Sequence, residues 1–184
     1  MYLTRKRYIG ANYEHNKVKG TIEIKKGNKK IPVDFTKVSY IDEAVGYWRK
    51  ANQIHKWFVD NVQEGVDDCK EYYVSVEKLK ELLDICKEVK AKAKLKKGKI
   101  ENGKHIENGQ WITDYIDGKY IENDAEIEAI LPTTSGFFFG GTGYDQWYMN
   151  DIDNTIHILE EILKEEKKDN KRHIYNEYYY QSSW

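Results

Sequence analysis

The residues best suited to chemistry lie close together in the first half of the chain. Trp48, Asn52 and His55 are spaced i, i+4 and i+7, so a helix would place them on one face. Together with Arg49 they can form the polar wall of a pocket, in which the His55 imidazole acts as a ligand or a base. The alternative is that Asn52 and His55 are hydrogen-bonded inside the core, because buried polar side chains find partners.

Two carboxylates and a thiol follow in the run Asp67-Asp68-Cys69. The carboxylates can pair with His55 as an acid–base couple or hold a divalent cation, although adjacent acidic residues between two helices are typical of a solvated loop. No motif that activates a thiol accompanies Cys69, and no second histidine stands four residues from His55. Because the ligand spacing of a zinc site is missing, we expect neither a metal nor a cofactor.

A glycine-rich segment, Gly140-Gly141-Thr142-Gly143, precedes an expected helix. It lacks the Gly-Lys-Ser/Thr ending of a P-loop and the glycine spacing of a dinucleotide fold. One interpretation is a looser cradle for a phosphate or an RNA backbone. The other is a turn into the helix that follows a buried strand at Phe137–Phe139.

Both ends of the chain combine cations with aromatic rings, a pattern that suits contact with phosphates and stacked bases. The same pattern is also typical of a surface strand and of a terminal segment that packs back on its own domain. The candidate nucleic-acid contacts are Arg5, Lys6, Arg7, Tyr178, Tyr179 and Trp184.

The net charge of −1 conceals a strong asymmetry. Residues 101–166 hold fifteen Asp and Glu against three Lys, whereas residues 1–50 hold twelve Lys and Arg against five Asp and Glu. An acidic surface can occupy a groove built for nucleic acid, so this asymmetry bears on partners more than on fold. The candidate partner-binding carboxylates are Asp114, Asp117, Glu122, Asp124, Glu126 and Glu128.

Length and composition predict one α+β core, over 1–98 and 131–184, with an inserted acidic β-meander lobe over 99–130. The apolar fraction of 40% is enough for a real core, and no apolar run approaches the roughly 20 residues that cross a bilayer. The N-terminus has no apolar signal region. We therefore expect a protein of the bacterial cytoplasm with reduced cysteines and no membrane contact.

Local patterns predict the elements of this core. A Gly27-Asn28 turn joins strands at 21–25 and 31–35, with Ile24 opposite Ile31, and a further strand is expected near 2–9. Three helices are expected in a layer against this small antiparallel sheet. Their predicted spans are about 39–63 from a capping box at Ser39, a second from an N-cap at Ser75, and a third from Asp145 or Asn150.

Three turn dipeptides, Asn102-Gly103, Asn108-Gly109 and Asp117-Gly118, predict the β-meander. Each supplies the two residues with positive φ that a type I′ turn requires. The apolar residues of this meander are Ile106, Trp111, Ile112, Tyr115, Tyr120 and Ile121.

Three blocks of the chain resemble a widespread family of small bacteriophage and prophage proteins. They are MYLTRKRYIGA, the stretch VGYWRKANQIHKWFV with NVQEGVDDCKEYYVS, and LPTTSGFFFGGTGYDQWYMNDI. In size and in its Lys/Asn/Ile/Tyr-rich composition the chain is also similar to anti-CRISPR proteins of the type II-A group. That resemblance implies a protein that binds a host RNA-guided nuclease with its guide RNA and stops target DNA being bound or cut. The resemblance implies no catalytic residues in this chain.

The physical hypothesis is that the acidic residues compete with DNA for the cations of such a nuclease. A second binding hypothesis has the basic N-terminal half touch nucleic acid directly. The alternatives from other classes are a phage enzyme of nucleotide or nucleic-acid metabolism, with His55 and Asp67 or Asp68 in a pocket, and a minor structural phage protein. Because no complete catalytic signature is present, we expect a binding protein and not an enzyme.

Overall fold

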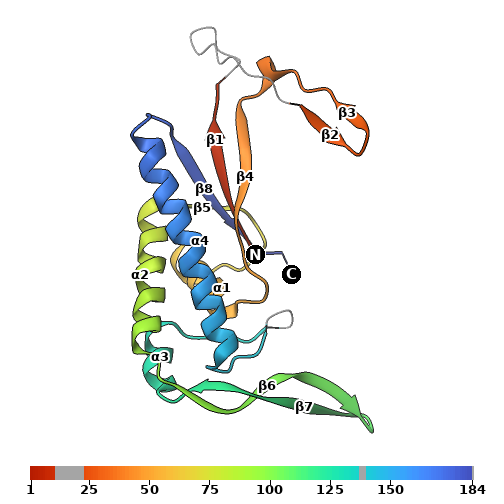
Figure 1. Cartoon of the computed structure of the whole chain (residues 1–184), viewed down its shortest axis with the longest axis vertical. Helices are drawn as coiled ribbons and strands as arrows, with labels where there is room; N and C mark the ends of the chain where they lie inside the picture. The colour runs from red at the N-terminus through yellow and green to blue at the C-terminus, as the bar shows by residue number, and fades with distance from the viewer. Residues whose placement is uncertain (11–22, 137–139, 184) are drawn as a thin grey trace.

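The computed structural model describes residues 1–10, 23–136 and 140–183, and its main sheet joins the two ends of the chain (Figure 1). This four-stranded sheet has the order β4-β1-β8-β5, and every neighbouring pair is antiparallel. The N-terminal strand β1 is therefore held between a strand from the middle of the sequence and the C-terminal strand. The strands are β1 (Tyr2–Tyr8), β4 (Tyr40–Tyr47), β5 (Tyr72–Val74) and β8 (Asn176–Gln181).

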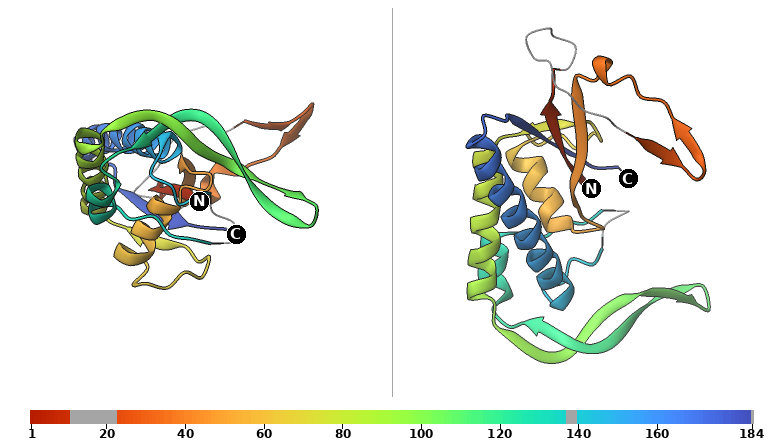
Figure 2. Two further views of the ribbon diagram at one scale, coloured as in Figure 1. Left: turned by 90° about the horizontal axis from the view of Figure 1, so that it is seen from below. Right: turned by 45° about the horizontal axis from the view of Figure 1, so that its top comes forward.

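The helices form a layer beside the sheet, in which α2 (Val76–Lys92) and α4 (Gln146–Asn170) run side by side (Figures 1 and 2). Both begin where the sequence predicts. Ser75 Oγ accepts from the Lys78 amide, and Asp145 Oδ1 accepts from the amides that open α4. Two shorter helices, α1 (Asn52–Asn61) and α3 (Asp124–Ile130), complete the layer. No helix of the described residues is long and apolar enough to cross a bilayer.

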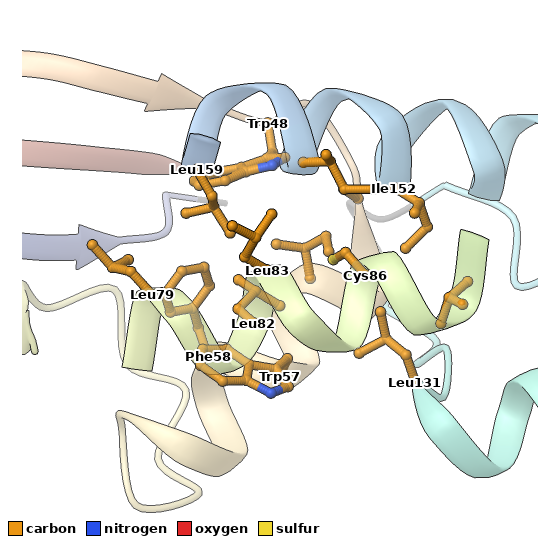
Figure 3. Packing of buried hydrophobic residues seen from close by; sticks show 14 of the residues in the cluster. Trp48, Trp57, Phe58, Leu79, Leu82, Leu83, Cys86, Leu131, Ile152 and Leu159 are labelled. Atoms are coloured by element: carbon orange, nitrogen blue, oxygen red, sulfur yellow. The ribbon is translucent and has the colours of Figure 1, made fainter. Parts of the chain in front are cut away.

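The hydrophobic core fills the space between the three longer helices and the sheet (Figure 3). Trp48 lies beneath α4, while Leu79, Leu82 and Cys86 project from α2 toward it. Phe58 of α1 stacks on Tyr180 of β8, with ring centroids 3.9 Å apart. The α+β class predicted from the sequence is confirmed.

The predicted helix over 39–63 is wrong in its first half, because residues 40–47 form β4. This strand pairs with β1 along its whole length. Its residues alternate between exposed and partly covered positions, which is the period of a strand. Tyr47 is exposed at the end of β4, whereas the buried residues Ile54 and Phe58 belong to α1, so the predicted span covers two elements. Only the second half is helical, and α1 ends at Asn61, close to the predicted end at residue 63.

The small hairpin of β2 (Ile24–Lys26) and β3 (Lys29–Ile31) has the predicted register, with Ile24 opposite Ile31. Gly27 has a positive φ and Asn28 does not, as a type II′ turn requires. Both isoleucines are nevertheless exposed, so this hairpin does not contribute to the core. A short 3₁₀ helix, η2 (Phe35–Lys37), follows it, and the predicted strand residues 21 and 22 lie outside the described residues.

The predicted meander is instead one long hairpin, β6 (Leu95–Glu107) and β7 (Gln110–Ile121) (Figure 2). Only Asn108-Gly109 makes a turn, with positive φ at both residues. Asn102-Gly103 lies at an irregularity in β6, where the pairing register shifts. Gly118 is inside β7, and a Cβ there would lie 2.5 Å from Ile100 Cδ1, so the glycine makes room for a buried isoleucine.

Candidate functional site

His55 is a buried core residue and not part of an open site. Its Nδ1 lies 2.8 Å from the hydroxyl of Tyr180, and its Nε2 lies 3.0 Å from a carboxylate oxygen of Asp67. The imidazole therefore ties α1 to the C-terminal strand and to the loop after the helix. His55 and Asp67 do meet, as the acid–base hypothesis requires, but neither of them lines the cavity described below.

The other predicted pocket residues separate into two groups. Trp48 is buried and donates from Nε1 to Thr155 Oγ1 in α4, so it belongs to the core. Asn52 is also buried, but its carboxamide donates to the Gly141 carbonyl and accepts from the Thr134 amide. It thus fixes the glycine-rich loop against the start of α1. Arg49 is exposed and lines the cavity that this loop borders.

Within the described residues the carboxylates beside His55 form no metal centre, and the buried cysteine, Cys86, belongs to α2 and not to this loop. Asp68 accepts from the Tyr72 hydroxyl and pairs with Lys70 at 2.6 Å, and these contacts lower the pKa of the carboxyl. Burial raises the pKa of the Cys86 thiol to about 12, which keeps it protonated. Within the described residues, no three His, Cys, Asp or Glu side chains are grouped as a metal site would need.

The nucleic-acid contacts of β1 stay a prediction, and the structure shows that these cations pair with carboxylates of the protein itself. The guanidinium of Arg5 is buried and pairs with Glu43 at 2.8 Å and with Glu165 at 2.6 Å. Burial opposes its charge, but the two carboxylates outweigh that effect and raise its pKa. Arg7 pairs with Asp169 at 2.7 Å. These pairs join β1 to β4 and α4, so the basic residues stabilise the sheet.

The predicted aromatic contacts at the C-terminus are also part of the sheet. Tyr178 is buried and donates its hydroxyl to Glu166, and burial raises the pKa of that hydroxyl. Tyr179 lies on the other face of the strand, where the ammonium of Lys6 sits 4.4 Å from its ring centre. Lys6 pairs in addition with Glu71 at 2.9 Å. Trp184 lies outside the described residues.

Three carboxylates of the predicted acidic surface contact basic side chains of the β6–β7 hairpin. Asp114 lies 2.9 Å from the His105 imidazole, Asp117 pairs with Lys99 at 2.8 Å, and Glu122 pairs with Lys96. The remaining three carboxylates sit on α3, where none of them pairs with a cation among the described residues. These exposed α3 residues are Asp124, Glu126 and Glu128.

The outer part of the β6–β7 hairpin exposes an apolar stripe, which we define as Ile106, Trp111 and Tyr115. Ile106 is directly opposite Trp111, and Tyr115 lies on the same face because side chains alternate along a strand. Their exposed fractions are 62%, 70% and 58%. The sequence analysis assigned these three residues to the apolar set of the meander. Of the six apolar residues in that set, only Ile121 is buried.

One cavity of about 780 Å³ lies where the base of this hairpin, the start of α1 and the start of α4 meet. Arg49 and Lys50 come from the segment before α1, and Lys104 comes from β6. The glycine-rich loop at residues 140–143 borders it, as do Trp147 and Asp151 of α4. The sequence indicated the loop and Arg49. It gave no sign of Trp147 or Asp151, whose positions in α4 resemble any other surface of an amphipathic helix.

Two carboxylates of this cavity have perturbed pKa values. Burial raises the pKa of Asp151 to about 6, and nearby Asp145 adds to the effect, while a hydrogen bond from Gln53 Nε2 opposes it. Burial also raises the pKa of Asp145, although its Oδ1 accepts from the amides of Trp147 and Tyr148. The cavity therefore combines exposed cations with partly buried hydrogen-bond acceptors.

No protein-family model matches the chain, and no curated protein or solved structure is detectably similar to it.

Proposed function

We propose that this protein is a bacteriophage-encoded inhibitor that docks on a host RNA-guided nuclease through its β6–β7 hairpin. The observation that carries the proposal is the exposed apolar stripe of Ile106, Trp111 and Tyr115 on an arm that leaves the body of the molecule (Figures 1 and 2). Tryptophan and tyrosine are the residues that most often anchor protein interfaces. An aromatic stripe that the fold leaves uncovered fits a surface that a partner covers.

The resemblance to type II-A anti-CRISPR proteins directs the proposal to the nuclease loaded with guide RNA. Such nucleases hold nucleic acid in positively charged channels and recognise a short duplex motif with arginines. The carboxylates of α3, which pair with no cation among the described residues, suit the rim of such a contact: Asp124, Glu126 and Glu128. Charge complementarity at a rim sets encounter rate and specificity, so we assign the affinity chiefly to the stripe.

The test is inhibition of a purified type II-A nuclease and guide RNA complex, with binding and target cleavage measured in parallel. We expect the wild type to bind and to block cleavage, and Trp111→Ser to weaken binding by about tenfold or more, since truncated interface anchors cost roughly 2 kcal/mol or more. Tyr175→Ser is the matched control, because Tyr175 is 76% exposed but lies outside the hairpin. Absence of inhibition by the wild type would refute the proposed target.

A second variant separates the stripe from the acidic rim. Replacing Glu122, Asp124, Glu126 and Glu128 by their amides should slow association and reduce its salt dependence, with a smaller loss of affinity than Trp111→Ser. If Trp111→Ser inhibits normally while the amide variant is inactive, the carboxylates and not the stripe carry the docking.

A further inference from the structure

We propose that the cavity between the hairpin base, α1 and α4 binds a nucleoside phosphate, either free or as one unit of a single-stranded RNA. This site adjoins the inner end of the apolar stripe, because Tyr115 pairs with cavity-lining Glu101, but it does not depend on the proposed nuclease target. Its volume of about 780 Å³ is within the range of small-molecule and cofactor sites and accommodates a mononucleotide.

Three cations at the cavity are the reason to expect that the ligand carries a phosphate. Arg49, Lys50 and Lys104 line it, and within the described residues none of them forms an ion pair or donates a side-chain hydrogen bond. By contrast, Arg5, Arg7 and many lysines elsewhere pair with a carboxylate of the protein. Three carboxylates, Glu101, Asp145 and Asp151, line the same cavity, but none of them forms an ion pair with these cations among the described residues. Cations that gather at one cavity without an ion-pair partner fit an external anion.

The glycine-rich loop adds backbone donors to the same cavity. The amides of residues 141–143 donate no hydrogen bond to another group of the described chain, whereas the Gly140 amide donates to the Lys50 carbonyl. Asn52 anchors the loop through the Gly141 carbonyl, so the loop is held in place before a ligand arrives. Free amides in a short glycine-rich turn are typical anion donors.

Residues at the start of α4 are the reason to expect that the ligand also carries a base and a ribose. The Trp147 ring lines the cavity and is 44% exposed, which leaves a surface on which a base can stack. Asp145 Oδ2 and Asp151 Oδ1 accept no hydrogen bond from the described chain, so they can accept from ribose hydroxyls or from the amino group of a base. A bare phosphate would use the cations and leave these groups unused.

The test is calorimetric titration of the full chain with each of the four ribonucleoside 5′-monophosphates, with inorganic phosphate, and with an eight-nucleotide single-stranded RNA. Arg49→Gln combined with Lys50→Gln should weaken nucleotide binding by about tenfold or more, since hydrogen bonds to charged groups contribute roughly 1.5–3 kcal/mol. The matched control is Lys87→Gln with Lys90→Gln, which removes two charges from α2 that pair with Glu160 and Asp153.

Trp147→Ala separates a nucleotide site from a simple anion site. We expect this variant to lose roughly fivefold or more in nucleotide affinity, from lost stacking, while inorganic phosphate binds as before. Tighter binding of the RNA than of any monophosphate, lost in the same variants, would identify a strand as the source of the ligand. The proposal is overturned if neither the monophosphates nor the RNA binds at millimolar concentration. It is also overturned if inorganic phosphate binds as tightly as the nucleotides. The same holds if the cavity double variant and the α2 double variant have equal affinity for the nucleotides.

Discussion

The four-stranded sheet and the β6–β7 hairpin share several kinds of residues, tyrosines with lysines and carboxylates, and use them in opposite ways. In the sheet, Tyr178 and Tyr180 are buried and Arg5 is enclosed by two carboxylates, because α1 and α4 cover that face. In the hairpin, Trp111 and Tyr115 remain exposed because no element packs on their face. Residue type alone therefore does not show whether a side chain stabilises the fold or stays exposed for a partner. What decides this is whether another helix or strand packs over the side chain.

The comparison also separates stability from binding. The sheet joins residues that are far apart in the sequence, from β1 to β8, so its side chains hold the fold together. Among the described residues, the hairpin buries apolar side chains against the body at its base, where Ile100 and Ile121 lie. Substitutions in the sheet should thus change the free energy of unfolding, and substitutions in the outer hairpin should change binding alone.

The largest expected difference in the free energy of unfolding comes from replacing one aromatic residue in each region by alanine. Tyr180→Ala removes the stack on Phe58 and the hydrogen bond to His55, and we expect a loss of about 3–5 kcal/mol in the free energy of unfolding. Trp111→Ala should change it by less than about 0.5 kcal/mol. Urea unfolding measures both. Equal losses would show that the hairpin is part of the cooperative core and remove the contrast.

The ion pairs of the two regions give the next contrast. Arg5→Ala leaves Glu43 and Glu165 without their cation beside a buried site, and we expect about 2–3 kcal/mol of destabilisation. Lys99→Ala breaks an exposed pair with Asp117 and should leave the midpoint of urea unfolding unchanged. A matching loss in both variants would mean that the hairpin pairs stabilise the fold as the sheet pairs do.

The smallest expected change in the free energy of unfolding concerns Asp151 in the cavity between the hairpin, α1 and α4, and this change depends on pH. Since the folded protein holds the pKa of Asp151 at about 6, above its ordinary value of 3.8, the charged carboxylate costs stability once the pH has risen through that interval. Asp151→Asn removes this cost while an amide oxygen still accepts from Gln53. We expect it to raise the free energy of unfolding by about 1–2 kcal/mol at pH 8 and to have little effect below pH 4. A gain that is equal at both pH values would point to packing and not to the charge.

Local patterns were sufficient where the signal lies within one element. The N-caps Ser75 and Asp145 begin α2 and α4 as expected, since a side-chain acceptor at that position satisfies amides that the helix leaves free. The Gly27-Asn28 and Asn108-Gly109 turns also form, because few residues other than glycine and asparagine tolerate the φ angles required. Asp117-Gly118 did not turn, because pairing with β6 continued through it.

The sequence by itself determined the α+β class, the two long helices and the turn at the hairpin tip, all of which depend on residues near one another in the chain. Only the tertiary structure decided that residues 40–47 pair as a strand and that the cations of β1 are neutralised by Glu43, Glu165 and Asp169. It also decided that Arg49, Lys104 and Trp147 share one cavity. These outcomes depend on contacts between residues up to 162 positions apart, which no local periodicity encodes.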